Sequence, residues 1–304
     1  GYNPSDFAAK AKFKAMVDID KNELKKNDIK LNLKVESDAN YFLEKLFYKL
    51  KKYNSDPDWI KYCSKVRRKH PIIINKMIDE KKYVNSYFFI DELSKLTKKN
   101  DSIITDMGFS FTTTHQALKV KGNQKFFTNS GHAPMGWGLP AAIGSYYAKK
   151  KSSSNIICLS GEGGFQMNIQ ELATIMHNKI PMKIFIFNNG GYLTIKQTQI
   201  LGFNGRIMGS DKNSGLSFPN YKSIAGAHSM LYKKINNHKN LKNEISKVLN
   251  LKKAVICELI MSPNEEQIPK AVNRRDENGK SMPAKLEDMY PFLSKEELSA
   301  SNLD

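Results

Sequence analysis

The sequence predicts an α/β protein whose main domain is a parallel sheet flanked by helices, with the remnant of a second α/β domain at the N-terminus. Between residues 83 and 262, segments with apolar residues at helical spacing alternate with short strand-like runs, which is typical of parallel strands connected by helices. The runs are mostly apolar, as expected for strands that helices cover on both faces. The turn GEGGFQMN at 161–168 separates one such strand from a helix and therefore indicates a ligand site.

The elements of the main domain follow in order from this pattern. We expect helices at 86–97, 140–150 and 168–178 and strands at 101–108, 155–160, 181–189 and 253–260. In the third helix, Leu172, Ile175 and Met176 recur at helical spacing and form a stripe that we expect to be buried. Asn168 is a suitable N-cap and Glu171 completes a capping-box pattern. We therefore expect this helix to begin near residue 169.

The segments on either side of the main domain differ from it in pattern. Residues 13–20 have the composition of a short strand and residues 37–53 the spacing of a helix. One strand and one helix do not form a domain, so we expect residues 1–53 to be the end of a domain that begins further upstream. Residues 54–82 are charged and broken by prolines, and we expect a linker there. Residues 263–304 show little periodicity and are predicted to form a C-terminal tail.

Composition limits the function classes. The chain has a formal net charge of +18, but scattered lysines carry most of it, and arginine, the preferred residue for phosphate and base contacts, is rare. We therefore expect a solvated lysine-rich surface and no nucleic-acid partner. No apolar run is long enough to cross a bilayer, so we expect no membrane association. Cys63, Cys158 and Cys257 are odd in number and lack metal-ligand spacing, which favours a reducing, cytoplasmic location.

The glycine turn and the end of the next strand carry residue types that suit a cation bound to phosphate. Parallel strands end at the same edge of a sheet, so Glu162 after one strand and Asn189 after the next are expected to lie close together. Carboxylate and amide oxygens are ligands that Mg²⁺ prefers, and glycine N–H groups bind phosphate oxygens. A dinucleotide-binding fingerprint is not matched, because Gln166 stands where its third glycine would be. Taken singly, each turn is also compatible with an ordinary glycine turn.

These motifs resemble those of the thiamine-diphosphate-dependent enzymes. Gly161-Glu162-Gly163, followed after residues 164–187 by Asn188-Asn189, is similar to the motif that begins Gly-Asp-Gly and ends Asn-Asn in that family. The segment GHAPMGWGLPAAIG at 131–144 resembles the glycine-rich segment of the acetolactate synthase group. The resemblance implies that residues 1–53, which precede the linker, form the end of that group's central domain. It also implies that residues 83–262 form its diphosphate-binding domain.

The resemblance implies roles for individual residues. The metal ion would be held by the side chains of Glu162 and Asn189 and by the carbonyl of Gly191. The expected cofactor contacts are Phe109, Ser110, Phe111, Thr112, Met135, Gly163, Gly164, Met167, Gly191 and Tyr192. Of these, Met167 matches the apolar residue that supports the bent cofactor, and Met135 offers its carbonyl to the aminopyrimidine.

One histidine and one substitution bear on the chemistry. His132 lies inside the glycine-rich segment, and we expect it, ahead of His115, His177 and His228, to line the substrate site as an acid or base. The family's metal-binding aspartate is replaced by Glu162. The additional methylene displaces the carboxylate oxygens by roughly 1.5 Å unless the backbone adjusts, and Mg²⁺ tolerates little displacement of its ligands.

By resemblance, the chain is the C-terminal portion of a thiamine-diphosphate- and Mg²⁺-dependent enzyme. Such an enzyme, a transferase or lyase, decarboxylates a small 2-oxo acid or joins it to a second carbonyl compound, and the family implies a homodimer or homotetramer. The acid that activates the cofactor normally lies in a separate pyrimidine-binding domain, so we expect these 304 residues alone to be inactive. A non-catalytic binding or regulatory module that keeps the fold is the alternative that remains open.

Overall fold

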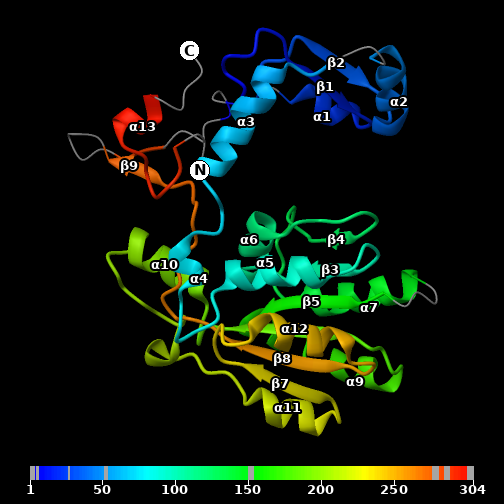
Figure 1. Ribbon diagram of the computed structural model, residues 1–304, viewed down its shortest axis with the longest axis vertical. Helices are drawn as coiled ribbons and strands as arrows, with labels where there is room; N and C mark the ends of the chain where they lie inside the picture. Colours follow the sequence, from blue (N-terminus) through cyan, green and yellow to red (C-terminus); the bar gives the residue numbers. More distant parts are fainter. Residues whose placement is uncertain are drawn as a thin grey trace. The chain divides into compact units, whose positions relative to one another are not determined.

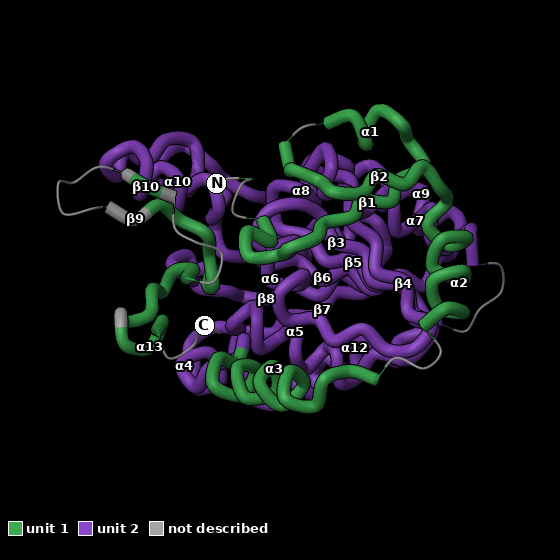
Figure 2. Tube along the Cα trace, turned by 90° about the horizontal axis from the view of Figure 1, so that it is seen from above, with its two compact units in different colours: residues 1–71, 268–304 green, residues 72–267 purple. Residues whose placement is uncertain are grey.

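The computed structural model of the protein describes residues 4, 7–26, 28–50, 54–149, 154–275, 281–283 and 288–299. The chain divides into two compact units, which Figure 2 draws in different colours. One unit is Ile72–Gln267, and the other combines Gly1–Pro71 with Ile268–Asp304.

The larger unit is built on a six-stranded sheet with the strand order β4-β3-β5-β6-β8-β7, and all neighbouring strands in it run parallel. The strands are β3 (Ser102–Thr105), β4 (Lys125–Phe127), β5 (Ile156–Gly161), β6 (Lys183–Asn188), β7 (Leu231–Ile235) and β8 (Val255–Ile260). The inner strands β3, β5, β6 and β8 are buried over nearly their whole length. The predicted parallel sheet is therefore confirmed.

Helices cover both faces of this sheet (Figure 1). The longer helices of the unit are α5 (Ser86–Leu96), α6 (Phe109–Ala117), α7 (Gly138–Ala148), α9 (Glu171–His177), α10 (Leu193–Gly202), α11 (Tyr221–Ala227) and α12 (Leu241–Asn250). On one face α7, α9 and α11 contribute to a single core with the sheet's isoleucines. On the other, α5 packs against α6 and α12, and its Phe89 contacts Phe185 and Phe187 of β6. The stripe predicted in α9 is confirmed for Leu172 and Ile175, which are fully buried, and Met176 is partly buried against the same core.

The strand order places a topological switch point between β3 and β5. The chain passes from β3 to β4 on one side and then crosses back to β5 on the other side of β3. The connections after β3 and β5 therefore diverge and leave a crevice at the carboxyl ends of these strands, where ligands bind in open α/β sheets. The segment beginning at Asp106 follows β3, and α8 (Glu162–Met167) follows β5 directly.

The glycine turn is helical, which corrects our expectation of a helix start near residue 169. The chain enters α8 at Glu162, leaves it at the C-cap Asn168 and enters α9 at Glu171. Asn168 does not cap α9, and its Nδ2 donates to the Gly136 carbonyl at 2.8 Å instead. Two glycines in succession disfavour a helix intrinsically. Here the packing described below leaves no room for a side chain at either, so tertiary structure decides the conformation.

The smaller unit contains a parallel pair, β1 (Ala15–Asp18) and β2 (Leu33–Glu36). Its other elements are α1 (Lys21–Lys25), α2 (Ala39–Lys49), α3 (Pro57–Lys69), the antiparallel strands β9 (Asn273–Arg275) and β10 (Ser281–Pro283), and α13 (Lys295–Ser299). The strand and the helix predicted near the N-terminus are confirmed as β1 and α2.

Parts of the predicted flanking segments lie outside the described residues. These are 51–53 at the end of the predicted helix and 276–280, 284–287 and 300–304 in the predicted tail. The segment predicted as a linker contains α3 and, in the larger unit, α4 (Asn75–Ile78). None of the helices in the described part of the chain has the length and apolar character that crossing a membrane requires.

Candidate functional site

A cavity of about 70 Å³ lies at the switch point. The predicted site residues that line this cavity are Phe109, Met135, Glu162, Gly163, Gly164, Asn189, Gly191 and Tyr192. Gly161, the first residue of the sequence motif, also lines it, and sequence reasoning did not single out the remaining lining residues, Met107, Gly108, Leu193, Thr194 and Ile195. One water molecule needs about 10–15 Å³ of such volume, so the cavity has room for a cation and several waters.

Glu162 presents an unpaired carboxylate oxygen in this cavity. As the first residue of α8 it is only 1% exposed. Its Oε1 accepts a hydrogen bond from the Gly190 N–H at 2.6 Å, whereas Oε2 has no hydrogen-bond partner among the described residues. Burial raises the pKa of Glu162 to about 8, more than the surrounding backbone N–H groups lower it. A cation at Oε2 would remove the main cost of burying this charge.

Asn189 adds a second unpaired oxygen. It is 7% exposed, and its Oδ1 likewise lacks a partner in the described part of the chain. Gly190 follows with φ +77°, a left-handed conformation that suits glycine and forms the turn after β6. The described residues contain no cluster of three His, Cys, Asp or Glu side chains that would hold a metal. A cation here would therefore depend on one carboxylate together with amide and carbonyl oxygens, a set suited to Mg²⁺.

Three glycines around the cavity have no space for a side chain. A Cβ at Gly163 would lie 1.8 Å from Cε1 of Tyr192, whose ring covers it. A Cβ at Gly164 would lie 2.4 Å from a carboxylate oxygen of Asp106, and one at Gly191 would lie 2.2 Å from a backbone carbonyl oxygen. The sequence motif predicted that Gly163 and Gly164 approach a diphosphate, which stays a prediction; the structure shows that all three positions must be glycine because neighbouring protein atoms occupy the space of a side chain.

Asp106, which sequence reasoning missed, connects the segments around the cavity. It is 1% exposed at the end of β3. Its Oδ1 accepts hydrogen bonds from the N–H groups of Met107 at 2.7 Å and Gly136 at 2.9 Å, and its Oδ2 accepts one from the Ser160 hydroxyl at 2.9 Å. Burial raises the pKa of Asp106 against the opposing effect of these donors. The only sequence signal was an acidic residue at the end of an apolar strand.

The other predicted site residues lie outside the cavity lining. The hydroxyls of Ser110 and Thr112 donate to nearby backbone carbonyls, and the ring of Phe111 packs on a histidine of its own helix. Met167 is half exposed at the end of α8. His132 is exposed in a turn. The structure thus brings together the predicted metal ligands and the glycines, but not these five.

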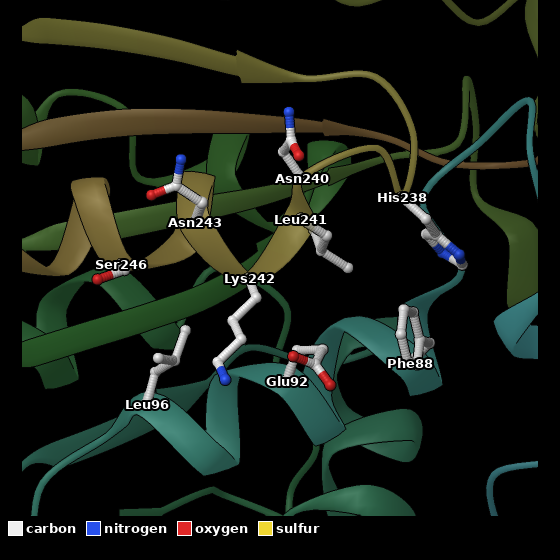
Figure 3. A pocket seen from close by; sticks show the side chains of 9 residues that line it. All are labelled: Phe88, Glu92, Leu96, His238, Asn240, Leu241, Lys242, Asn243 and Ser246. Carbon is white, nitrogen blue, oxygen red and sulfur yellow. The ribbon is translucent and has the colours of Figure 1, made fainter.

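A larger hollow of about 550 Å³ lies between α5 and α12 (Figure 3). Two of its ionisable lining residues, Glu92 and His238, already have partners within the chain. The Glu92 carboxylate pairs with Lys95 at 2.5 Å, and the His238 ring contacts the Asn85 N–H and the Ile78 carbonyl. Chemistry, and not size, therefore selects the smaller cavity at the switch point as the candidate site.

Comparison with known proteins points to the same segment. Residues 106–259 match the family described as "Thiamine pyrophosphate enzyme, C-terminal TPP binding domain", and this stretch contains every residue that lines the cavity. The acetolactate synthase large subunit of Cyanidium caldarium is 30% identical over 259 residues, which cover 83% of this chain and 43% of the relative.

Two further relatives carry related names. The acetolactate synthase large subunit of Lactococcus lactis is 30% identical over 268 residues, covering 88% of this chain and 44% of the relative. The acetolactate synthase isozyme 2 large subunit of Escherichia coli is 28% identical over 212 residues, covering 70% and 37%. The chain thus spans less than half the length of these curated relatives. By the match of residues 106–259, the chain belongs to the thiamine pyrophosphate enzyme family and contains its C-terminal TPP-binding domain.

Proposed function

We propose that this chain supplies the diphosphate-binding part of the active site in a thiamine-diphosphate- and Mg²⁺-dependent enzyme. The enzyme would decarboxylate a small 2-oxo acid or join it to a second carbonyl compound, as the name acetolactate synthase indicates for the relatives. From the family resemblance, we also propose that the chain acts within a homodimer or homotetramer. The observation that carries the proposal is the pair of buried, unpartnered oxygens on Glu162 and Asn189 at the switch point.

The residues present fit a cation bridged to a diphosphate. Glu162 Oε2 and Asn189 Oδ1 lack partners among the described residues, and both residues line one cavity with Gly191. Gly163 and Gly164 line the same cavity, and because the Tyr192 ring and the Asp106 carboxylate occupy the space of their missing side chains, what they would offer a diphosphate is backbone N–H groups. The cavity of about 70 Å³ has room for a cation and its nearest ligands. The thiazolium and aminopyrimidine rings would lie beyond it.

The residues of this chain would bind and orient, while thiamine diphosphate, once bound, supplies the electron sink for decarboxylation. Glu162, Asn189 and the Gly191 carbonyl would hold the cation, and the Gly163–Gly164 backbone would meet the phosphate oxygens. The Tyr192 ring covers Gly163 and would help to keep water from the diphosphate. Asp106 accepts a hydrogen bond from the Gly136 N–H. It would thereby hold in place the adjacent Met135, whose carbonyl is the predicted contact of the aminopyrimidine.

Calorimetric titration with Mg²⁺ and thiamine diphosphate tests the proposal. Glu162→Ala removes one proposed ligand and is expected to weaken Mg²⁺-dependent binding at least tenfold, about 1.4 kcal/mol. The control Glu244→Ala removes a carboxylate on α12 that pairs with Lys247 and is expected to leave binding unchanged. Equal affinity of the Glu162→Ala variant and the wild type would refute the assignment.

Glu162→Asp refines the same test, because it restores the residue of the family motif. Tighter binding by this variant would show that the longer side chain is a compromised ligand. Weaker binding would show that the site has adapted to glutamate.

A further inference from the structure

A chain of hydrogen bonds leads away from the candidate cation site across the sheet. The Gly190 N–H that donates to Glu162 Oε1 at 2.6 Å is also 3.2 Å from Asn188 Oδ1. The Asn188 amide donates through Nδ2 to Glu258 Oε1 at 2.5 Å. The second oxygen of Glu258 accepts a hydrogen bond from the Tyr232 hydroxyl. The chain thus connects residues of β7, β8 and β6 with the start of α8.

Glu258 is a buried carboxylate among mainly apolar side chains, which indicates a specific role. It pairs with Ile186 in the register of β6 and β8, and its neighbours at alternate positions of β8 are Ile256 and Ile260. Ile186 and Ile256 belong to the apolar core on this face, and Glu258 itself is only 8% exposed. Burying a carboxylate in such a layer is costly unless hydrogen bonds compensate.

The register brings Glu258 to Asn188. Asn188 pairs with Ile260, two residues beyond Glu258, and side chains two apart along a strand point to the same face. Glu258 and Asn188 are therefore diagonal neighbours on one face. Each carboxylate oxygen of Glu258 accepts one hydrogen bond, Oε1 from Asn188 Nδ2 and Oε2 from the Tyr232 hydroxyl. The carboxylate therefore fixes the Asn188 amide with its N–H₂ group toward Glu258. The amide oxygen is then directed to the Gly190 N–H.

We propose that Glu258 is a positioning residue for the cation site and acts through Asn188 on the turn Asn189–Gly191. By fixing the orientation of the Asn188 amide, Glu258 holds the Gly190 N–H between Asn188 Oδ1 and Glu162 Oε1. The Gly190 N–H in turn fixes the position of Glu162 relative to the turn that carries the other two proposed ligands, Asn189 and Gly191. The inference rests on the proposed function, since the cation is the ligand whose affinity it concerns. Residues that orient metal ligands typically change metal affinity by about 10–100-fold when mutated.

Binding of Mn²⁺, measured by electron paramagnetic resonance at saturating thiamine diphosphate, tests the inference. Glu258→Leu removes both hydrogen bonds and is expected to raise the Mn²⁺ dissociation constant about 10–100-fold. Glu258→Gln keeps an oxygen for Asn188 and an N–H₂ group for the Tyr232 oxygen, so we expect it to stay within about threefold of the wild type. Asn188→Ala removes the same Asn188–Glu258 hydrogen bond at the less buried partner. We expect its Mn²⁺ dissociation constant to match that of Glu258→Leu, so the test does not depend on correct folding of the leucine variant.

Ile256→Ala is the matched control, because it also weakens the core on the same face of β8 but has no polar contact with the site. It is expected to lower the unfolding temperature without changing the Mn²⁺ dissociation constant. The inference is overturned if Glu258→Leu and Asn188→Ala bind Mn²⁺ like the wild type. It is also overturned if Ile256→Ala loses as much affinity as they do. Failure of the wild type to bind Mn²⁺ would instead overturn the proposed function, and the inference with it.

Discussion

Glu265 makes the stability of the larger unit depend on pH. It is 8% exposed beside the N-terminus of α5. Its Oε1 accepts hydrogen bonds from the Ser86 hydroxyl at 2.6 Å, the Ser86 N–H at 2.9 Å and Asn85 Nδ2 at 2.9 Å. Its Oε2 has no partner within the described residues. Burial raises the pKa of Glu265 to about 7, more than the hydrogen bonds from Ser86 lower it.

The direction of the effect follows from the raised pKa. The folded protein keeps the proton on Glu265 up to about pH 7, whereas the unfolded chain releases it near the ordinary value of 4.5. The contribution to stability is therefore fully present below pH 4.5 and is lost as the pH rises through 7. At 1.36 kcal/mol per pKa unit, the whole effect amounts to about 3 kcal/mol, of which about 2 kcal/mol falls between roughly pH 5 and 7.5.

Urea unfolding of the wild type and of Glu265→Gln across this pH range measures the effect. Glutamine does not ionise, keeps an oxygen for Ser86, and leaves unchanged the contact of the residue 265 carbonyl with Gln197. Other titrating groups contribute equally to both proteins. The free energy of unfolding of the wild type, relative to the variant, should therefore fall by about 2 kcal/mol from roughly pH 5 to 7.5. Parallel curves for the two proteins would refute the reasoning.

Two further substitutions test the packing around the cavity by thermal unfolding. Gly163→Ala should destabilise the protein by about 1–3 kcal/mol, because the new Cβ would lie 1.8 Å from the Tyr192 ring. Gly144→Ala, where nothing lies within 4 Å, is the control and should stabilise α7 slightly; equal unfolding temperatures of the two variants would contradict the steric argument. Asp106→Ala should cost about 1–3 kcal/mol for each buried donor left unpaired, and a variant as stable as the wild type would show that water replaces the carboxylate.

The sequence predicted the centre of the sheet better than its edges. Strands β5, β6 and β8 are mostly apolar because helices cover both faces, and such runs can be recognised from the sequence alone. The edge strands β4 and β7 were missed. β4 has only three residues, and β7 places lysines in the middle of the strand, where most positions are exposed. An edge strand forms by pairing with one neighbouring strand. The local sequence pattern does not identify that neighbour.

The candidate site shows the same division. Glu162, Asn189 and the glycines were predicted because they form a motif of residue types at strand ends. Asp106 and Glu258 were missed because each is a single acidic residue in an apolar strand, with partners far along the chain. Asp106 accepts hydrogen bonds from residues 30 and 54 positions away, and Glu258 from a residue 70 positions away. Only the folded structure brings such pairs together.

The substitution of glutamate for the aspartate of the family motif takes a different meaning in the structure. Gly161 pairs with Phe187 in the register of β5 and β6, so Glu162 must reach across to the turn that follows β6. It does so by accepting the Gly190 N–H at 2.6 Å through one oxygen, while the other remains unpartnered in the described part of the chain. An aspartate on the same backbone would end roughly 1.5 Å short and would need its backbone or the turn to shift before making this contact. The additional methylene therefore closes the hydrogen bond to the turn and leaves the second oxygen unpartnered in a cavity that Asn189 also lines, so the longer side chain is compatible with the proposed cation site and does not by itself abolish it.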